Sequence, residues 1–549
     1  MNKVFVIGID SATFDVINPL MARGELPNLL KLVQNGCSGA LHSTFPPVTP
    51  PAWVSFMTGK NPGKHGVFDF YAPPMYGYDR PVLNANYIKA KTLWAILSEQ
   101  GKKVGVINVP ITYPPERVNG FIVPGIQYGI DIKDNFTYPS NLIDKIFAKF
   151  GTYDVAYGNL MGVYSHELDN YIKQWEILHN IREKVILSLM DEYEWDFFMA
   201  VFYSIDAIQH RFWKYYDENH PHYDALNAKK YANVIPTFYK KIDTSIGRIL
   251  DKLDSSTVVM VVSDHGMGPE HKAFYLNTWL RKEGLLHIKR DLYPFIWLKP
   301  PHLFFKILNK LRYKGVAWTI PMALYNTLKR VVDPRDGLKT TYFIDWSKTK
   351  AYAANHTEQG IYINLKGREP NGTVQEGDEY EALRDYIISK LRGIIDPESG
   401  KPLFDEIHKK EDFYEGPHVR NAPDMFFLMR GATCLSHPEL YHKGMFGVDN
   451  RNSATHRMDG IFIINGNGVV SGKTIQGANI TDMAPTILHT MGLSVPRDMD
   501  GKVLAEVFNK PSSVIYGDDN TERKGTDSGV FSTEESENIK AKLRDLGYV

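Results

Sequence analysis

The chain has 549 residues, 43% of them hydrophobic and 23% charged, which is an ordinary globular composition and excludes a disordered protein. Lysine and arginine total 63, as do aspartate and glutamate, so the formal net charge is zero and we expect no specific binding of nucleic acid. The two cysteines, Cys37 and Cys434, exclude a disulfide framework and suit a reducing compartment.

The N-terminal apolar run is short. Asp10 interrupts it and no small-residue cleavage site follows, so we expect no secretory signal. No uncharged apolar stretch reaches the roughly 18 residues of a membrane span. These features together predict a cytoplasmic protein.

The first half of the chain alternates strand-like apolar runs with amphipathic stretches. Amphipathic segments at 92–101 and 233–253 lie between the runs. This alternation predicts an α/β fold with a mostly parallel central sheet and helices on both faces. In such sheets the functional groups gather beyond the carboxyl ends of the strands. The runs are VFVIGI (4–9), KVGVINV (103–109), DFFMAVF (196–202) and TVVMVVSD (257–264).

The pattern of predicted elements changes after the fourth apolar run, where the loops are longer and the strand candidates are shorter. The length also exceeds what one simple core usually holds, so we expect an insertion or a second domain. We interpret 276–439 as an inserted cap that selects the substrate. The core would then comprise 1–275 and 440–510, and 511–549 would form a C-terminal extension ending in a helix.

One part of the cap, residues 292–332, is basic, aromatic and free of acidic residues. An apolar stripe at helical spacing runs through it, with lysines off the stripe. The interpretation that we favour is a cap helix with a solvated basic face. The alternative is peripheral membrane contact through 300–332, which gives the same pattern.

Ligand-type side chains cluster at the ends of the predicted strands. Each alone has a commoner explanation, such as a helix cap or polar surface. Together they indicate two divalent metal ions, because clustered carboxylates and imidazoles are costly without a compensating cation. The six residues are Asp10, Asp206, His210, Asp264, His265 and His456.

Thr49 lies in the proline-fenced turn FPPVTPPAW, before a stretch that we expect to be helical from Ala52. A hydroxyl at a helix N-terminus beside a metal ion is an activated nucleophile, because the ion lowers its pKa and the helix dipole favours the anion. A simple capping threonine is the competing explanation.

The order of these motifs resembles the alkaline phosphatase superfamily, and within it the type I phosphodiesterase and nucleotide pyrophosphatase branch. The resemblance rests on the residues above with FMTGKNPGKHG after Thr49 and DMAPTILHTMGLSVPRDMDGKVL near the end of the core. It implies one metal held by Asp10, Asp264 and His265 and touching Thr49, and a second held by three other ligands. Those three are Asp206, His210 and His456.

The resemblance further implies a two-metal phosphoric ester hydrolase that forms a covalent phospho-threonine at Thr49. The mixed oxygen and nitrogen ligands favour Zn²⁺, with Mn²⁺ as the alternative. The expected partner is a small phosphate ester or pyrophosphate.

One departure from the family pattern concerns the residue three positions after Thr49, which is commonly an asparagine that holds a phosphoryl oxygen. Here it is Ala52. Asn108, at the end of the second strand-like run, is a candidate replacement, although a turn-forming asparagine before Pro110 is the simpler explanation.

The choice between diester and monoester depends on positive charge near the nucleophile. Prolines, Ala52 and Trp53 follow Thr49 and no arginine does, which favours a diester or pyrophosphate. A cap residue such as Arg368 could reach the substrate.

Phosphomonoesterase or phosphomutase activity on the same site is the alternative. A non-catalytic or membrane-surface binding protein is the rival of another class.

Overall fold

The protein is described by a computed structural model. It describes residues 2–125, 135–151, 153, 168–289, 332–333, 337–338, 340–355, 357–440, 444–448, 452–510, 513–518, 523 and 530–546. The basic segment at 300–332 falls outside this part of the chain, apart from Val332, which begins a two-residue strand at 332–333, so its two interpretations stay open. Among the described residues, no helix has both the length and the apolar character that crossing a bilayer requires.

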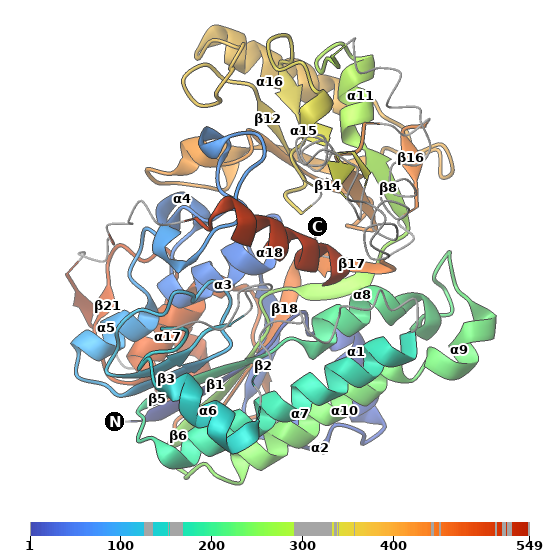
Figure 1. The fold of residues 1–549 in the computed structure, drawn as a ribbon. Coiled ribbons are helices and arrows are strands. Elements are labelled where there is room, and N and C mark those ends of the chain that lie inside the picture. Colours follow the sequence, from blue (N-terminus) through green and yellow to red (C-terminus); the bar gives the residue numbers. More distant parts are fainter. Residues whose placement is uncertain are drawn as a thin grey trace, which may run out of the picture.

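A nine-stranded sheet forms the centre of the larger unit (Figure 1). All its pairings are parallel except those of β18, which runs antiparallel to both β6 and β2. The predicted mostly parallel α/β fold is therefore confirmed. In spatial order the strands are β19 (Lys473–Thr474), β2 (Cys37–His42), β18 (Asp459–Asn465), β6 (Thr257–Val262), β1 (Lys3–Ile9), β5 (Phe197–Phe202), β3 (Val104–Ile107) and β4 (Gly120–Val123), with β20 (Ala478–Asn479) beside β2.

The central strands are apolar on both faces because helices cover both. In β1 every residue after Lys3 is buried, and β5 and β6 are buried throughout. Helices α3, α5 and α17 pack together on one side of the sheet, and α1, α2, α7, α8 and α10 on the other (Figure 1). Their bounds are α1 (Phe14–Ala22), α2 (Pro27–Asn35), α3 (Thr49–Thr58), α5 (Leu93–Glu99), α7 (Leu168–Glu192), α8 (Ser204–Tyr216), α10 (Val234–Leu250) and α17 (Met483–Thr490).

A smaller unit with its own hydrophobic core stands above the carboxyl edge of the sheet (Figure 1). Its buried side chains run from Phe274 to Leu440, close to the predicted cap, whose boundaries stay a prediction. One sheet has the order β11 (Ala351–Tyr352), β12 (Gly360–Ile363), β14 (Met425–Met429) and β13 (Phe404–Lys409), and another has the order β15 (Cys434–His437), β8 (Lys272–Tyr275) and β16 (Phe446–Gly447). Its helices include α11 (Leu276–Lys282), α15 (Thr340–Phe343) and α16 (Asp378–Arg392).

Short elements complete the described chain. They are α4 (Pro62–His65), α6 (Leu142–Phe150), α9 (Ala225–Tyr231), the pair β7 (Gly266–Pro269) and β17 (Ala454–Arg457), the pair β9 (Val332–Asp333) and β10 (Gly337–Leu338), the pair β21 (Val495–Pro496) and β22 (Tyr516–Gly517), and α18 (Thr533–Leu546). Helix α18 lies between the two units (Figure 1). It begins with a capping box, in which Ser532 Oγ accepts from the Glu535 N–H and the Glu535 carboxylate accepts from the Ser532 N–H.

A buried ionic cluster joins the larger unit to the smaller one. Arg80 donates to Glu358 over 2.7 Å and its guanidinium lies 3.5 Å from Asp69. The Thr357 hydroxyl lies 2.8 Å from both Asp69 Oδ1 and Asn355 Oδ1, although it has one proton to donate. A protonated Asp69 satisfies both contacts, because it donates to Thr357 while Thr357 donates to Asn355. Burial and repulsion from Glu358 raise the pKa of Asp69 to about 7, which agrees with a protonated side chain.

This raised pKa predicts a pH-dependent contribution to stability. The unfolded pKa is about 3.9, so the stabilisation from protonated Asp69 is complete below about pH 4 and is lost as the pH rises to about 7. Between pH 5 and pH 8, we expect wild type to lose about 2–3 kcal/mol more of its unfolding free energy than Asp69→Asn loses. Urea unfolding at both pH values measures it. Asp79→Asn removes an exposed carboxylate of the same segment and should show no such shift.

Candidate metal centre and nucleophile

Three adjacent strands of the central sheet end on carboxylates. Asp10 follows β1, Asp264 follows β6, and Asp206 lies in the first turn of α8, directly after β5. Because these strands are parallel, their carboxyl ends meet at one edge, and all three carboxylates are fully buried there.

The first ligand group comprises Asp10, Asp264 and His265, whose ligand atoms all lie within 4.8 Å of one another. His265 Nε2 lies 3.1 Å from Asp264 Oδ2 and 3.9 Å from Asp10 Oδ1. The same Nε2 lies 3.1 Å from the Thr49 hydroxyl oxygen. The nucleophile predicted from sequence is therefore placed against this group.

The second ligand group comprises Asp206, His210 and His456. Asp206 Oδ1 lies 3.5 Å from His210 Nε2 and 3.4 Å from His456 Nε2. The opposite ring nitrogens, Nδ1, lie 2.8 Å from the Ala454 carbonyl and 2.9 Å from the Pro47 carbonyl. Donation to these carbonyls directs the Nε2 lone pairs into the group, which is the arrangement of ligating histidines.

The electrostatics of both groups fit divalent cations. Burial raises the pKa values of Asp10 and Asp264 well above their usual range. Burial also opposes ionisation of Asp206, but the His210 and His456 imidazoles outweigh it and hold its pKa well below the usual value. One oxygen of each carboxylate accepts no hydrogen bond from the described residues. Buried carboxylate oxygens that lack donors are the groups that metal ions neutralise.

Comparison with known proteins assigns the chain to a protein family. A family model for type I phosphodiesterase / nucleotide pyrophosphatase matches residues 4–460. The chain belongs to this family. The match confirms the resemblance inferred from the motifs and makes the protein a member of a phosphoester hydrolase family.

A solved structure supports the fold of this family member. Human ectonucleotide pyrophosphatase / phosphodiesterase 5 matches with a TM-score of 0.50 and 11% identity, over 92% of this chain and 100% of the human chain. Phosphonoacetate hydrolase from Sinorhizobium meliloti, in complex with phosphonoacetate, matches with a TM-score of 0.48 and 14% identity, over 88% and 94% of the two chains. At these identities the likeness to the human protein establishes the fold alone.

The helix that carries the predicted nucleophile of this phosphodiesterase-family protein begins three residues earlier than expected. Helix α3 starts at Thr49, not at Ala52. Pro50 and Pro51 occupy its first turn, where backbone N–H groups need no acceptor within the helix, so the prolines favour this start. Thr49 is only 1% exposed, and the positive end of the helix dipole points at its hydroxyl.

Ser11 was missed from sequence, yet it connects the two ligand groups. Its hydroxyl donates to Asp206 Oδ1 over 2.5 Å and lies 3.1 Å from His265 Nδ1, while its N–H donates to Asp264 Oδ1 over 3.3 Å. Its φ of 62° is in the left-handed region that serine rarely adopts. Such strain is concentrated at functional sites. The sequence signal was a small polar residue directly after the ligand at a strand end.

Asn108 lies at the same edge of the sheet, at the end of β3, and it stays a prediction as a substrate-binding residue. Its φ of 61° is also left-handed. The Tyr153 hydroxyl donates to its side-chain oxygen over 2.5 Å, and its amide nitrogen has no acceptor among the described residues. An oriented, buried amide donor of this kind suits an oxygen of a ligand.

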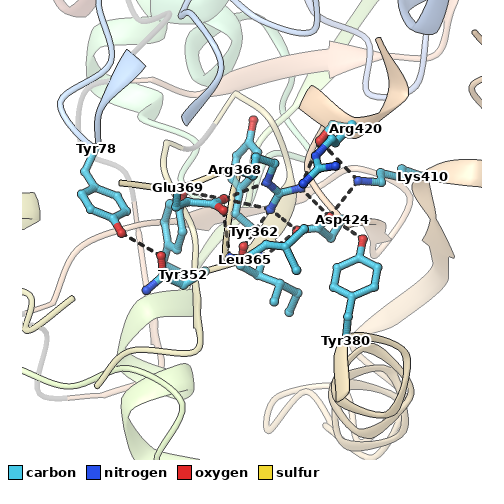
Figure 2. Close-up of polar contacts among 12 residues, drawn as sticks. Tyr78, Tyr352, Tyr362, Leu365, Arg368, Glu369, Tyr380, Lys410, Arg420 and Asp424 are labelled. Atoms are coloured by element: carbon cyan, nitrogen blue, oxygen red, sulfur yellow. Dashed lines mark hydrogen bonds and ion pairs between the residues drawn. The ribbon is translucent and has the colours of Figure 1, made fainter. Parts of the chain in front are cut away.

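The structure does not bring Arg368 to the ligand groups. Figure 2 shows its guanidinium enclosed by the smaller unit, where the side chain is 1% exposed. Every N–H of the guanidinium has an acceptor, so this side chain holds the smaller unit together instead of reaching a substrate. The acceptors are Glu369, both carboxylate oxygens of Asp424, and the carbonyls of Ile363 and Arg420.

Metal analysis tests the second ligand group. We expect the protein dialysed against Zn²⁺ or Mn²⁺ to retain two ions per chain, and His456→Ala to retain about one, because the remaining two ligands bind more weakly. Elemental analysis after gel filtration measures the content. His222→Ala removes an imidazole outside both groups and should retain two ions. Wild-type protein without stoichiometric metal would contradict the assignment.

Proposed function

We propose that the protein is a two-metal phosphodiesterase or pyrophosphatase in which Thr49 is the nucleophile. The observation that carries this proposal is the 3.1 Å contact between the Thr49 hydroxyl and His265, a member of the first ligand group. A buried threonine at a helix N-terminus beside buried carboxylates has no evident capping role. Its position is that of a group prepared to attack phosphorus.

Two divalent ions, Zn²⁺ or Mn²⁺, would be held by the two ligand groups and would favour the Thr49 alkoxide and neutralise charge on the phosphoryl and leaving oxygens. The chain supplies the rest of the arrangement. The N-terminus of α3 stabilises negative charge on Thr49 Oγ. Ser11 orients Asp206 and Asp264, and Trp53 donates to Asp10 Oδ2 over 3.3 Å, so the carboxylates keep fixed positions.

The reaction would take place in two displacements. Thr49 Oγ loses its proton and forms a bond to phosphorus, while the bond between phosphorus and the leaving oxygen breaks and that oxygen takes up a proton. Water then attacks the phospho-threonine, which restores the Thr49 hydroxyl and releases the second product. In-line geometry requires the leaving oxygen to lie opposite Thr49.

The surroundings of Thr49 favour a diester over a monoester. A monoester dianion calls for a cationic clamp. Lys60 and Lys64 follow on the same segment, but they pair with Asp498 and Asp500. Side chains that are already paired with carboxylates add little to the binding of a further anion.

Substitution of Thr49 tests the proposal. We expect Thr49→Ala to lose about a thousandfold or more in the rate of bis(4-nitrophenyl) phosphate hydrolysis with Zn²⁺ or Mn²⁺ present, because the attacking oxygen is absent. Thr49→Ser keeps this oxygen and should stay within about tenfold of wild type. Release of 4-nitrophenol measures both rates.

Thr58→Ala is the matched control, since it removes a buried threonine hydroxyl at the far end of the same helix. It should keep wild-type turnover and metal content. Full activity in Thr49→Ala at unchanged metal content would refute the covalent mechanism.

A further inference from the structure

A cavity opens from the second ligand group toward the smaller unit. His210 and His456 line its inner end, and residues 45–48, directly before Thr49, line one side. Strands β14 and β15 of the smaller unit form the opposite wall. A group esterified to a phosphate at the ligand groups would therefore extend between the two units.

Much of the cavity lining is apolar. Phe45 and Val48 contribute from the larger unit, and Leu428, Met429 and Leu435 contribute from the smaller one. These side chains offer hydrocarbon contact to a bound group.

Polar side chains also line the cavity, and two of them, His437 and Glu270, pair with each other. His437 is the last residue of β15, where pairing with Tyr275 of β8 fixes its backbone, and its side chain is 8% exposed. Its Nε2 lies 3.9 Å from Glu270 Oε1, and its Nδ1 lies 3.6 Å from Glu439 Oε2. Of these three residues, Glu270 and His437 line the cavity.

The two side chains offer opposite hydrogen-bonding characters. Burial opposes protonation of His437, but contact with Glu270 and Glu439 outweighs it and raises its pKa to about 10. His437 is therefore an imidazolium donor at neutral pH, and a carboxylate is an acceptor. A hydroxyl both donates and accepts, so one hydroxyl can hydrogen-bond to both groups, whereas an alkyl chain can bond to neither.

Charge argues against a second phosphate in this cavity. Among the described residues that line it, none is lysine or arginine. The positive charge of His437 is compensated by its carboxylate neighbours. A further phosphoryl group would meet Glu270 without a cation of its own.

We propose that this cavity binds a hydroxylated organic group of the substrate, of the glycerol, polyol or sugar class, and that Glu270 and His437 recognise its hydroxyls. The apolar wall contacts the carbon skeleton of that group. The inference rests on the proposed phosphodiesterase function and narrows its substrates to diesters of polyhydroxy alcohols.

The test compares bis(glyceryl) phosphate with dipropyl phosphate. Both diesters are symmetric, so the same group enters the cavity whichever ester bond breaks, and they differ only in hydroxyls. The metal-loaded full chain hydrolyses each, and phosphorus-31 NMR quantifies the monoester product. We expect kcat/KM to favour the glyceryl ester by about tenfold or more, because a site built for hydroxyls discriminates against analogues without them.

Variants assign the preference to named residues. Glu270→Gln and His437→Gln should each reduce the ratio of the two kcat/KM values at least fivefold while the metal content stays at the wild-type value. Glu406→Gln is the matched control, because Glu406 contacts His408 of the smaller unit and neither residue lines the cavity, and it should keep the preference.

Equal kcat/KM values for the two diesters in a wild-type protein that hydrolyses bis(4-nitrophenyl) phosphate would overturn this inference and leave the proposed function standing. An unchanged ratio in both Glu270→Gln and His437→Gln would overturn the residue assignment. Absence of turnover with every diester at full metal loading would overturn the proposed phosphodiesterase activity and this inference with it.

Discussion

The structure depends on negative charge that is buried at one edge of a parallel sheet. Asp10, Asp206 and Asp264 are fully removed from solvent, and no amount of apolar packing compensates three carboxylates. Imidazoles, the Ser11 hydroxyl and the N-terminus of α3 supply part of the compensation. The proposed cations would supply the remainder, so the stability of this edge and the proposed chemistry would have the same origin.

The fold and the clustering of the candidate ligands could be predicted because Asp10, Asp206 and Asp264 stand where apolar runs end. Parallel strands bring such ends together, and α8 sets His210 one turn after Asp206. Ser11 could not be predicted as a link between the groups, because its role depends on a left-handed backbone and on contacts with residues about 200 and 250 positions away. The enclosure of Arg368 could not be predicted because its partner Asp424 lies 56 positions away.

The smaller unit was the part hardest to interpret from sequence. Its strands are short, and two of its sheets are built from segments far apart in the chain, as when β15 pairs with β8. The cluster of Asp69, Arg80 and Glu358 shows why it keeps its place above the sheet edge. Charged groups buried between two units define one docking arrangement more strictly than apolar contact does. The part of the cavity lining that the smaller unit supplies therefore has a defined position.

The placement of β18 has a consequence for biosynthesis. Among the described residues, β2 pairs only with strands drawn from 459–479, and β18 also covers the open edge of β6. A nascent polypeptide that has reached residue 458 already contains β1 to β6, but both edges of β2 and one edge of β6 are still unpaired. Folding of the larger unit must wait for the smaller one to be translated, and premature termination there would leave an aggregation-prone fragment.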